Sequence, residues 1–356
     1  MSRQTQAIIH ADAILNNYTA LTRLAPGSQA MAVIKADAYG HGAVNIARIL
    51  RGHVQAFAVA ITEEAIKLRE NGVKEPIVVL EGPHQKKDCI LASQHNLTLV
   101  LHDESQLRWV DELQLRIAIW LKVDTGMHRL GLPPAQLVSL VNTYQHLLNE
   151  QSVLVSHLAC ADEPDVALNT QQLARLSQLA KAVNMPVSVA NSPATLSLSG
   201  SHGAWNRLGL ALYGANPLHP APSRLTLQPA MTLRASVIAL RQVRAGEGVG
   251  YGQVWQAPRD SLIATVGIGY ADGYPRHCPN GTPVLVRGAR AALVGRVSMD
   301  MLSIDVTDIP AVALGDTVEL WGEQLSVDEV ASCAQTVAYE LVTRVSPRVP
   351  RVVRYQ

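Results

Sequence analysis

The sequence contains few cysteines and no excess of charge of one sign. Lysine and arginine number 30 and the acidic residues 29, without a basic run or stripe, so the charge does not indicate nucleic acid or an anionic membrane as a partner. The four cysteines lie too far apart for a zinc or redox motif, so we expect reduced thiols and no metal: Cys89, Cys160, Cys278 and Cys333. Zinc-binding and nucleic-acid-binding proteins are therefore disfavoured.

The sequence also lacks long hydrophobic runs. No window approaches the roughly twenty apolar residues that a spanning helix needs, and the first residues do not have the pattern of a secretion signal. We therefore expect a soluble protein of the cytoplasm with no membrane partner. Hydrophobic residues make up 48% of the chain, enough for one or two substantial cores.

Short apolar runs alternate with helical stretches through the first two-thirds of the chain. The runs cover residues 30–36, 56–60, 76–82, 97–103, 117–124, 153–159, 187–193 and 208–215. Between them, stretches such as 103–114 and 169–183 have the apolar spacing of amphipathic helices. Continuous hydrophobicity is typical of strands covered on both faces, so eight such units predict an α/β fold, a (β/α)8 TIM barrel over residues 1–228. A doubly wound open sheet is the alternative.

The last third changes character. Strand-like runs follow one another without long helices at residues 231–243, 261–270, 283–288, 291–306 and 316–322. They predict a C-terminal, mostly antiparallel β domain over residues 229–356. The opening run at residues 5–10 is compatible with a strand of either domain, the barrel or the β domain.

Polar residues stand where the apolar runs end, which in a barrel is the side of the active site. Lys35 ends the first run, and Tyr39 lies in the glycine-rich loop that follows. A lysine amine with a depressed pKa can form an imine with an aldehyde, as lysines do with pyridoxal phosphate. The alternative is a lysine that extends to water at the rim.

Further candidates stand near the ends of other runs, except Arg207, which opens the last run, and each also has an ordinary structural explanation. Lys122 and Arg129 could pair with Asp124, and His157 could be a satisfied core histidine. Asn191 and Ser192 could simply cap a helix, and Arg207, followed by Gly209 and Leu210, could pair with a surface acid. Gathered at one end of a barrel, they predict a site for an anionic ring cofactor. In the second domain, Tyr270 with Asp272 and Met299 with Asp300 follow strands, where hairpin corners are the alternative.

Taken together, these segments resemble the alanine racemases, a family of fold-type III pyridoxal-phosphate enzymes. The likeness runs over essentially the whole chain, through VIKADAYGHG, LKVDTGMHRLG, SHLA, ANSPATL, RLGLALYG, GYADGYPR, GRVSMDM and RVPRVV. It implies that pyridoxal 5'-phosphate is bound covalently by Lys35. It assigns the remaining cofactor contacts to Tyr39, His157, Asn191, Ser192, Arg207, Gly209 and Leu210.

The resemblance also implies the substrate contacts and the assembly. Arg129 would reach the substrate carboxylate, positioned by Lys122, which is carbamylated in many members. Tyr270 and Met299, with Asp300 in support, would enter the site from the partner subunit of a homodimer. Two positions depart from the pattern: Pro347 stands where some members have a tyrosine at the phosphate site, and Ser188 stands where some have a histidine.

The implied activity is the interconversion of L-alanine and D-alanine. Racemisation removes the α-proton on one face and returns it on the other, so two bases are the economical design, and we assign them to Lys35 and Tyr270. The product could supply peptidoglycan, or the enzyme could serve alanine catabolism. A decarboxylase of the same fold and a non-catalytic pyridoxal-phosphate carrier are the alternatives. Arg207 at the ring nitrogen argues against decarboxylation, because a neutral ring is a weak electron sink.

Overall fold

Eight parallel strands form the barrel in the computed structural model, which describes residues 3–218 and 225–355. The strands are β2 (Gln29–Val33), β3 (Ala56–Val59), β4 (Ile77–Val79), β5 (Thr98–Leu101), β6 (Ala118–Lys122), β7 (Leu154–Val155), β8 (Val187–Ser188) and β9 (Trp205–Leu208). Each pairs in parallel with the next along the chain from β2 to β8, and β2 also pairs with β9. The Arg207 amide donates to the Ala190 carbonyl at 2.9 Å, which closes the ring between β8 and β9. The prediction of a closed barrel is confirmed, and the open sheet is excluded.

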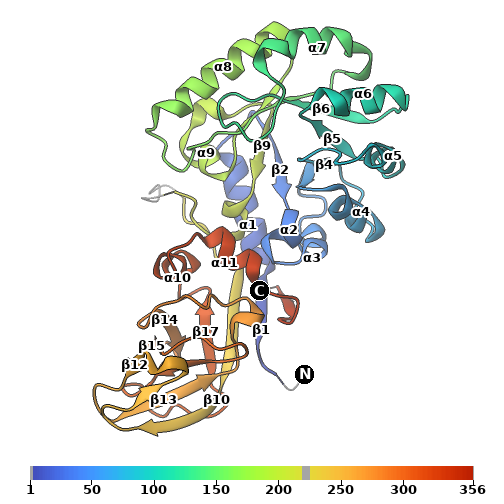
Figure 1. Cartoon of the computed structure of the whole chain (residues 1–356). Helices are drawn as coiled ribbons and strands as arrows, with labels where there is room; N and C mark the ends of the chain where they lie inside the picture. Colours follow the sequence, from blue (N-terminus) through green and yellow to red (C-terminus); the bar gives the residue numbers. More distant parts are fainter. Residues whose placement is uncertain (1–2, 219–224, 356) are drawn as a thin grey trace.

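Helices cover the outside of the barrel (Figure 1). They are α1 (Ala11–Arg23), α3 (Ala43–Ile49), α4 (Thr62–Glu70), α5 (Lys86–Gln94), α6 (Glu104–Glu112), α7 (Leu137–Thr143), α8 (Ala167–Val183) and α9 (Ser192–Ser197). Helix α6 shows why such segments fold as they do. Asp103 accepts the Ser105 amide as N-cap, and the same helix buries Leu107 and Val110 against the strands. No helix in the described part of the chain is long and apolar enough to cross a membrane.

The eighth strand lies earlier than predicted. Residues 208–215 were expected to form it, but β9 is Trp205–Leu208, and Leu210–Tyr213 form a 3-10 turn. Asn206 and Arg207 make the true strand look polar in the sequence. The four residues of the turn are apolar and buried, so the turn has the hydrophobic pattern of a strand. Arg207 therefore lies near the end of its strand, not at its start.

An eight-stranded, mostly antiparallel sheet forms the second domain, drawn below the barrel in Figure 1. Its strands are β1 (Gln6–His10), β10 (Met231–Val243), β13 (Ser261–Val266), β14 (Pro283–Val286), β15 (Ala289–Val294), β16 (Leu302–Asp305), β17 (Thr317–Trp321) and β18 (Arg351–Arg354). A separate hairpin consists of β11 (Gly248–Val249) and β12 (Trp255–Gln256). The predicted run 291–306 is two strands, β15 and β16, because the chain turns between them and the two pair with each other.

Strand β1 belongs to this sheet. It pairs antiparallel with β10 and parallel with β18 before the chain enters the barrel. Helices α10 (Val327–Cys333) and α11 (Ala338–Arg344) lie between the sheet and the barrel (Figure 1). Helix α11 lies very close to the barrel segment that follows Lys35, since a Cβ on Gly40 would lie 2.0 Å from the Val342 carbonyl oxygen of α11. Gly40 also has φ of +78°, so glycine is required there on both counts.

Candidate active site

The segment that carries Lys35 has an unusual backbone. Element α2 (Lys35–Tyr39) contains a left-handed turn, with φ of 51°, 52°, 57° and 52° at Ala36, Asp37, Ala38 and Tyr39. Left-handed helical geometry costs L-residues roughly 1–2 kcal/mol each, so four in succession require support from the rest of the fold. Tyr39, at the end of this turn, is buried.

A cavity of about 520 Å³ lies at the carboxyl ends of the barrel strands. Nine predicted site residues line it together: Lys35, Tyr39, Lys122, Arg129, His157, Asn191, Ser192, Arg207 and Gly209. Leu210 is buried and lines a neighbouring cavity of about 710 Å³ that shares His157 and Asn191 with the first. The strand ends therefore converge as the barrel prediction requires.

The cavity is strongly cationic. Burial lowers the pKa of Lys35; Arg129 and Arg207 lower it further, while Glu81 and Glu64 oppose them. Burial, Arg207 and Arg129 together lower the pKa of Lys122 to about 7, against the opposing effect of Asp124. Such a cavity fits an anion, and it favours the unprotonated, reactive form of both lysine amines.

Arg207 and His157 form a fixed pair on the cavity wall. Arg207 Nη1 donates to the backbone oxygen and to Oγ of Ser188 at 2.9 and 3.0 Å, and Nη2 lies 3.1 Å from His157 Nδ1. Because a guanidinium only donates, His157 Nδ1 must accept and carries no proton. Burial and Arg207 hold the pKa of His157 well below its usual range, which agrees with a neutral ring. Ser188, one of the two departures, thus anchors Arg207.

Tyr39, Ser192 and Gly209 form a small polar cradle. Ser192 Oγ accepts the amides of Gly209 at 2.9 Å and Ala211 at 3.2 Å, so its own proton is left to donate elsewhere. A Cβ at position 209 would lie 2.8 Å from the Tyr39 hydroxyl, so the cradle needs glycine. Burial raises the pKa of Tyr39, which keeps this hydroxyl protonated as a donor. These donors suit a phosphate group.

The hydrogen bonds bear on two of the structural alternatives, the helix cap at Asn191 and the pairing of Asp124. Asn191 does cap α9, since its Oδ1 accepts the Ala194 amide at 3.2 Å, and it also lines the cavity. Asp124 accepts the amides of residues 126–128 and His128 Nδ1 at 2.8 Å. Its carboxylate thereby shapes the loop that presents Arg129.

The predicted residues of the β domain do not join this cavity within the chain. Tyr270 and Met299 are 36% and 53% exposed, and Asp300 accepts Arg348 Nη2 at 2.7 Å. Contacts of buried Asp272 hold the Tyr270 turn: its carboxylate accepts the Gly269 amide at 3.0 Å and pairs with Arg3.

Several lining residues were not predicted. Glu81 ends the run 76–82, so the rule used for the other candidates could have found it. Tyr339 of α11 also lines the cavity, with its ring 5.9 Å from that of Tyr39. No pattern in the sequence indicates it. Pro347, the other departure, is exposed and is not among the lining residues.

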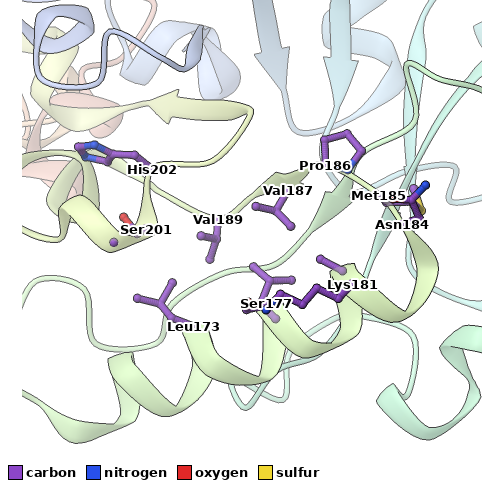
Figure 2. Close-up of a pocket in the computed structure, with 13 residues that line it drawn as sticks. Leu173, Ser177, Lys181, Asn184, Met185, Pro186, Val187, Val189, Ser201 and His202 are labelled. Atoms are coloured by element: carbon purple, nitrogen blue, oxygen red, sulfur yellow. The ribbon is translucent and has the colours of Figure 1, made fainter.

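A cavity of similar size lies elsewhere on the barrel. Figure 2 shows it between α8 and the segment after it, with Leu173, Lys181 and Val187 among its walls and a volume of about 510 Å³. It contains none of the predicted site residues. The catalytic candidates therefore all belong to the strand-end cavity or to the β domain.

Comparison with known proteins agrees with the resemblance. The family models "Alanine racemase, N-terminal domain" and "Alanine racemase, C-terminal domain" match residues 9–217 and 230–353. An alanine racemase of Alteromonas mediterranea is 58% identical, and the alignment covers 100% of both chains. Among solved structures, biosynthetic alanine racemase from Pseudomonas aeruginosa superposes with a TM-score of 0.93 at 45% identity, over 99% of each chain. Alanine racemase from Bartonella henselae, with covalently bound pyridoxal phosphate, superposes with a TM-score of 0.90 at 30% identity, over 98% of this chain and 99% of that one.

Proposed function

Because the chain belongs to the alanine racemase family and interconverts L-alanine and D-alanine, we propose that Lys35 and Tyr270 are its two bases and that pyridoxal 5'-phosphate is its cofactor. The observation that carries the proposal is the position of the half-buried Lys35 amine in a cationic cavity beside the cradle of Tyr39, Ser192 and Gly209. The decarboxylase and the non-catalytic carrier are set aside, since full-length relatives are alanine racemases.

The residues of the cavity fit this cofactor. When bound, pyridoxal 5'-phosphate would supply an aldehyde that condenses with amines and a ring that withdraws electrons from the substrate α-carbon. Ser192 and Tyr39 would donate hydrogen bonds to its phosphate, and Leu210 and Asn191 would also contact the cofactor. Arg207 would donate to the ring nitrogen. Although burial and Arg129 lower the pKa of Arg207 to about 10, it stays protonated at neutral pH and would leave that nitrogen unprotonated.

Tyr270 would enter the site from a second copy of the chain. Its exposed ring lies outside the cavity of its own chain, and it stands on a turn held by Asp272. Met299 and Asp300 would accompany it to the mouth of the partner's barrel. Lys35 Nζ and the Tyr270 hydroxyl would then take and return the α-proton on opposite faces of the substrate.

Arg129 would hold the substrate carboxylate, and Lys122 would set the position of Arg129. An amine with a pKa near 7 is largely available to react with carbon dioxide, and the resulting carbamate would place a negative charge between Arg129 and Arg207. We therefore propose that Lys122 is carbamylated in the active enzyme.

Two other sequence predictions remain proposals. One is a location in the cytoplasm, without nucleic acid or membrane as a partner. The other is the division of the chain into residues 1–228 and 229–356. Strand β1 complicates this division, since it pairs with strands of the second domain.

The test combines trapping of the cofactor with directional kinetics. Borohydride reduction of the enzyme with pyridoxal 5'-phosphate, followed by peptide mapping, is expected to label Lys35. Tyr270→Phe is expected to slow α-proton exchange with solvent deuterium by about 10²-fold or more for one enantiomer of alanine, and far less for the other. A label on another lysine, or equal losses with both enantiomers, contradicts the proposal.

A further inference from the structure

Glu64 lies on α4 and is not among the residues that line the cavity. Its carboxylate joins two backbone segments beside the site. Oε1 accepts the amide of Ala36 at 2.6 Å, and Oε2 accepts the amide of Ala60 at 2.9 Å. Ala36 directly follows Lys35, and Ala60 directly follows β3. One side chain therefore ties the lysine turn to the end of the neighbouring strand.

The left-handed turn needs such ties, because its residues are in a conformation that alanine and aspartate disfavour. Other contacts hold it further along the chain. Asp37 Oδ1 accepts the Ala43 amide at 3.0 Å and lies 3.5 Å from Lys67 Nζ, also on α4. Of these contacts, the one made by Glu64 acts on the residue next to Lys35, so it bears most directly on the direction of the lysine side chain.

Glu64 also affects the charge of Lys35. Four charged groups act on this amine: Glu81 and Glu64 raise its pKa, while Arg129 and Arg207 lower it, as burial does most strongly. Removal of the Glu64 charge therefore leaves the two guanidinium groups opposed by Glu81 alone.

We propose that Glu64 is a positioning residue of this enzyme, which fixes the path of the Lys35 side chain into the cavity by holding the amides of Ala36 and Ala60. The inference rests on the proposed role of Lys35 as the cofactor lysine. Glu64 does not line the cavity, and it acts through the backbone and through its charge.

Glu64→Gln tests the inference in the full-length enzyme. The amide has the same size but carries no charge, and its single oxygen can accept only one of the two backbone bonds well. We expect the apoprotein to bind pyridoxal 5'-phosphate about tenfold more weakly in an absorbance titration, since a charge-assisted bond is lost. We also expect a lower Lys35 pKa in ¹³C NMR of the reductively methylated apoprotein. Glu63→Gln, an exposed glutamate on the same helix, is the control and should change neither value.

The outcomes separate this inference from the proposed function. If Glu64→Gln and Glu63→Gln give the same cofactor affinity and the same Lys35 pKa, Glu64 has no positioning role. If Glu64→Gln does not fold, Glu64→Asp replaces it. Aspartate keeps the charge but has a shorter reach, so we expect weaker cofactor binding with little change in the Lys35 pKa. Unchanged cofactor binding in this variant overturns the inference. If borohydride labels another lysine in the parent enzyme, it is the proposed function that fails.

Discussion

Lys122 shows how the cavity controls the charge of a single residue. It is buried at the end of β6, where burial, Arg207 and Arg129 lower its pKa from 10.5 to about 7. Between these two values the unfolded chain binds more protons at this position than the folded chain does. The folded state is therefore disfavoured by this lysine, fully below pH 7 and progressively less up to pH 10.5.

Lys122→Met should consequently stabilise the apoprotein in buffer free of carbon dioxide. We expect a gain of several degrees in Tm that is constant below about pH 7, shrinks between pH 7 and 10.5, and vanishes above. Thermal unfolding at a series of pH values measures it, with the exposed Lys74→Met as control. A gain that does not vary with pH would show that Lys122 does not titrate in this range.

At this scale, several of the residues that sequence analysis located stand near the ends of apolar runs. Lys35, Lys122 and His157 were found because parallel strands bring their carboxyl ends to one edge. Glu64 could not be found in this way, because it stands on a helix and its contacts are with backbone amides. The exact partner of Arg207 was equally hidden, since Ser188 reaches it only once the barrel closes.

Among the elements, the left-handed turn after Lys35 has a measurable stability cost. Ala36 is exposed with φ of 51°, so Ala36→Gly relieves the backbone without removing a buried methyl group. We expect the free energy of unfolding to rise by up to about 1 kcal/mol, since the relief exceeds the entropy cost of glycine.

The matched control for this change is Ala174→Gly on the exposed face of α8, a right-handed helix. There glycine should lower the free energy of unfolding by about 1 kcal/mol. Urea denaturation measures both variants. Destabilisation of similar size in both would show that the turn at Ala36 is not strained in solution.

The errors of the sequence analysis were errors of element boundary. Hydrophobic pattern predicted the eighth strand at 208–215, where burial of Leu210–Tyr213 in a turn imitates a strand. The hydrophobic pattern could not show that β9 contains Asn206 and Arg207, because these polar residues are buried only in the closed barrel. The long strand β10 matched its predicted run, since no turn interrupts it.

For the whole molecule, the placement of Tyr270 outside the cavity leads to a complementation test. Lys35→Ala and Tyr270→Phe should each be nearly inactive alone. After random reassociation of equal amounts of the two variants, half of the dimers contain one chain of each variant. Each of these mixed dimers has one intact site of two, so about a quarter of the parent activity should return.

The control is the double variant Lys35→Ala with Tyr270→Phe mixed with the parent chain. Such mixed dimers have no intact site if sites are shared, so activity should fall below that of the parent fraction alone. Failure of the single variants to complement, with mixed dimers shown by mass spectrometry, would place both bases in one chain.

The pairing of β1 with β10 and β18 has a consequence for biosynthesis. All the strands of the barrel precede β10 in the chain, whereas β1 takes its two neighbours from β10 and from Arg351–Arg354, which are synthesised after the barrel. A polypeptide that does not yet include residues 351–354 therefore leaves one edge of β1 unpaired beside a barrel whose strands are all present, so the second sheet is completed after the barrel can fold.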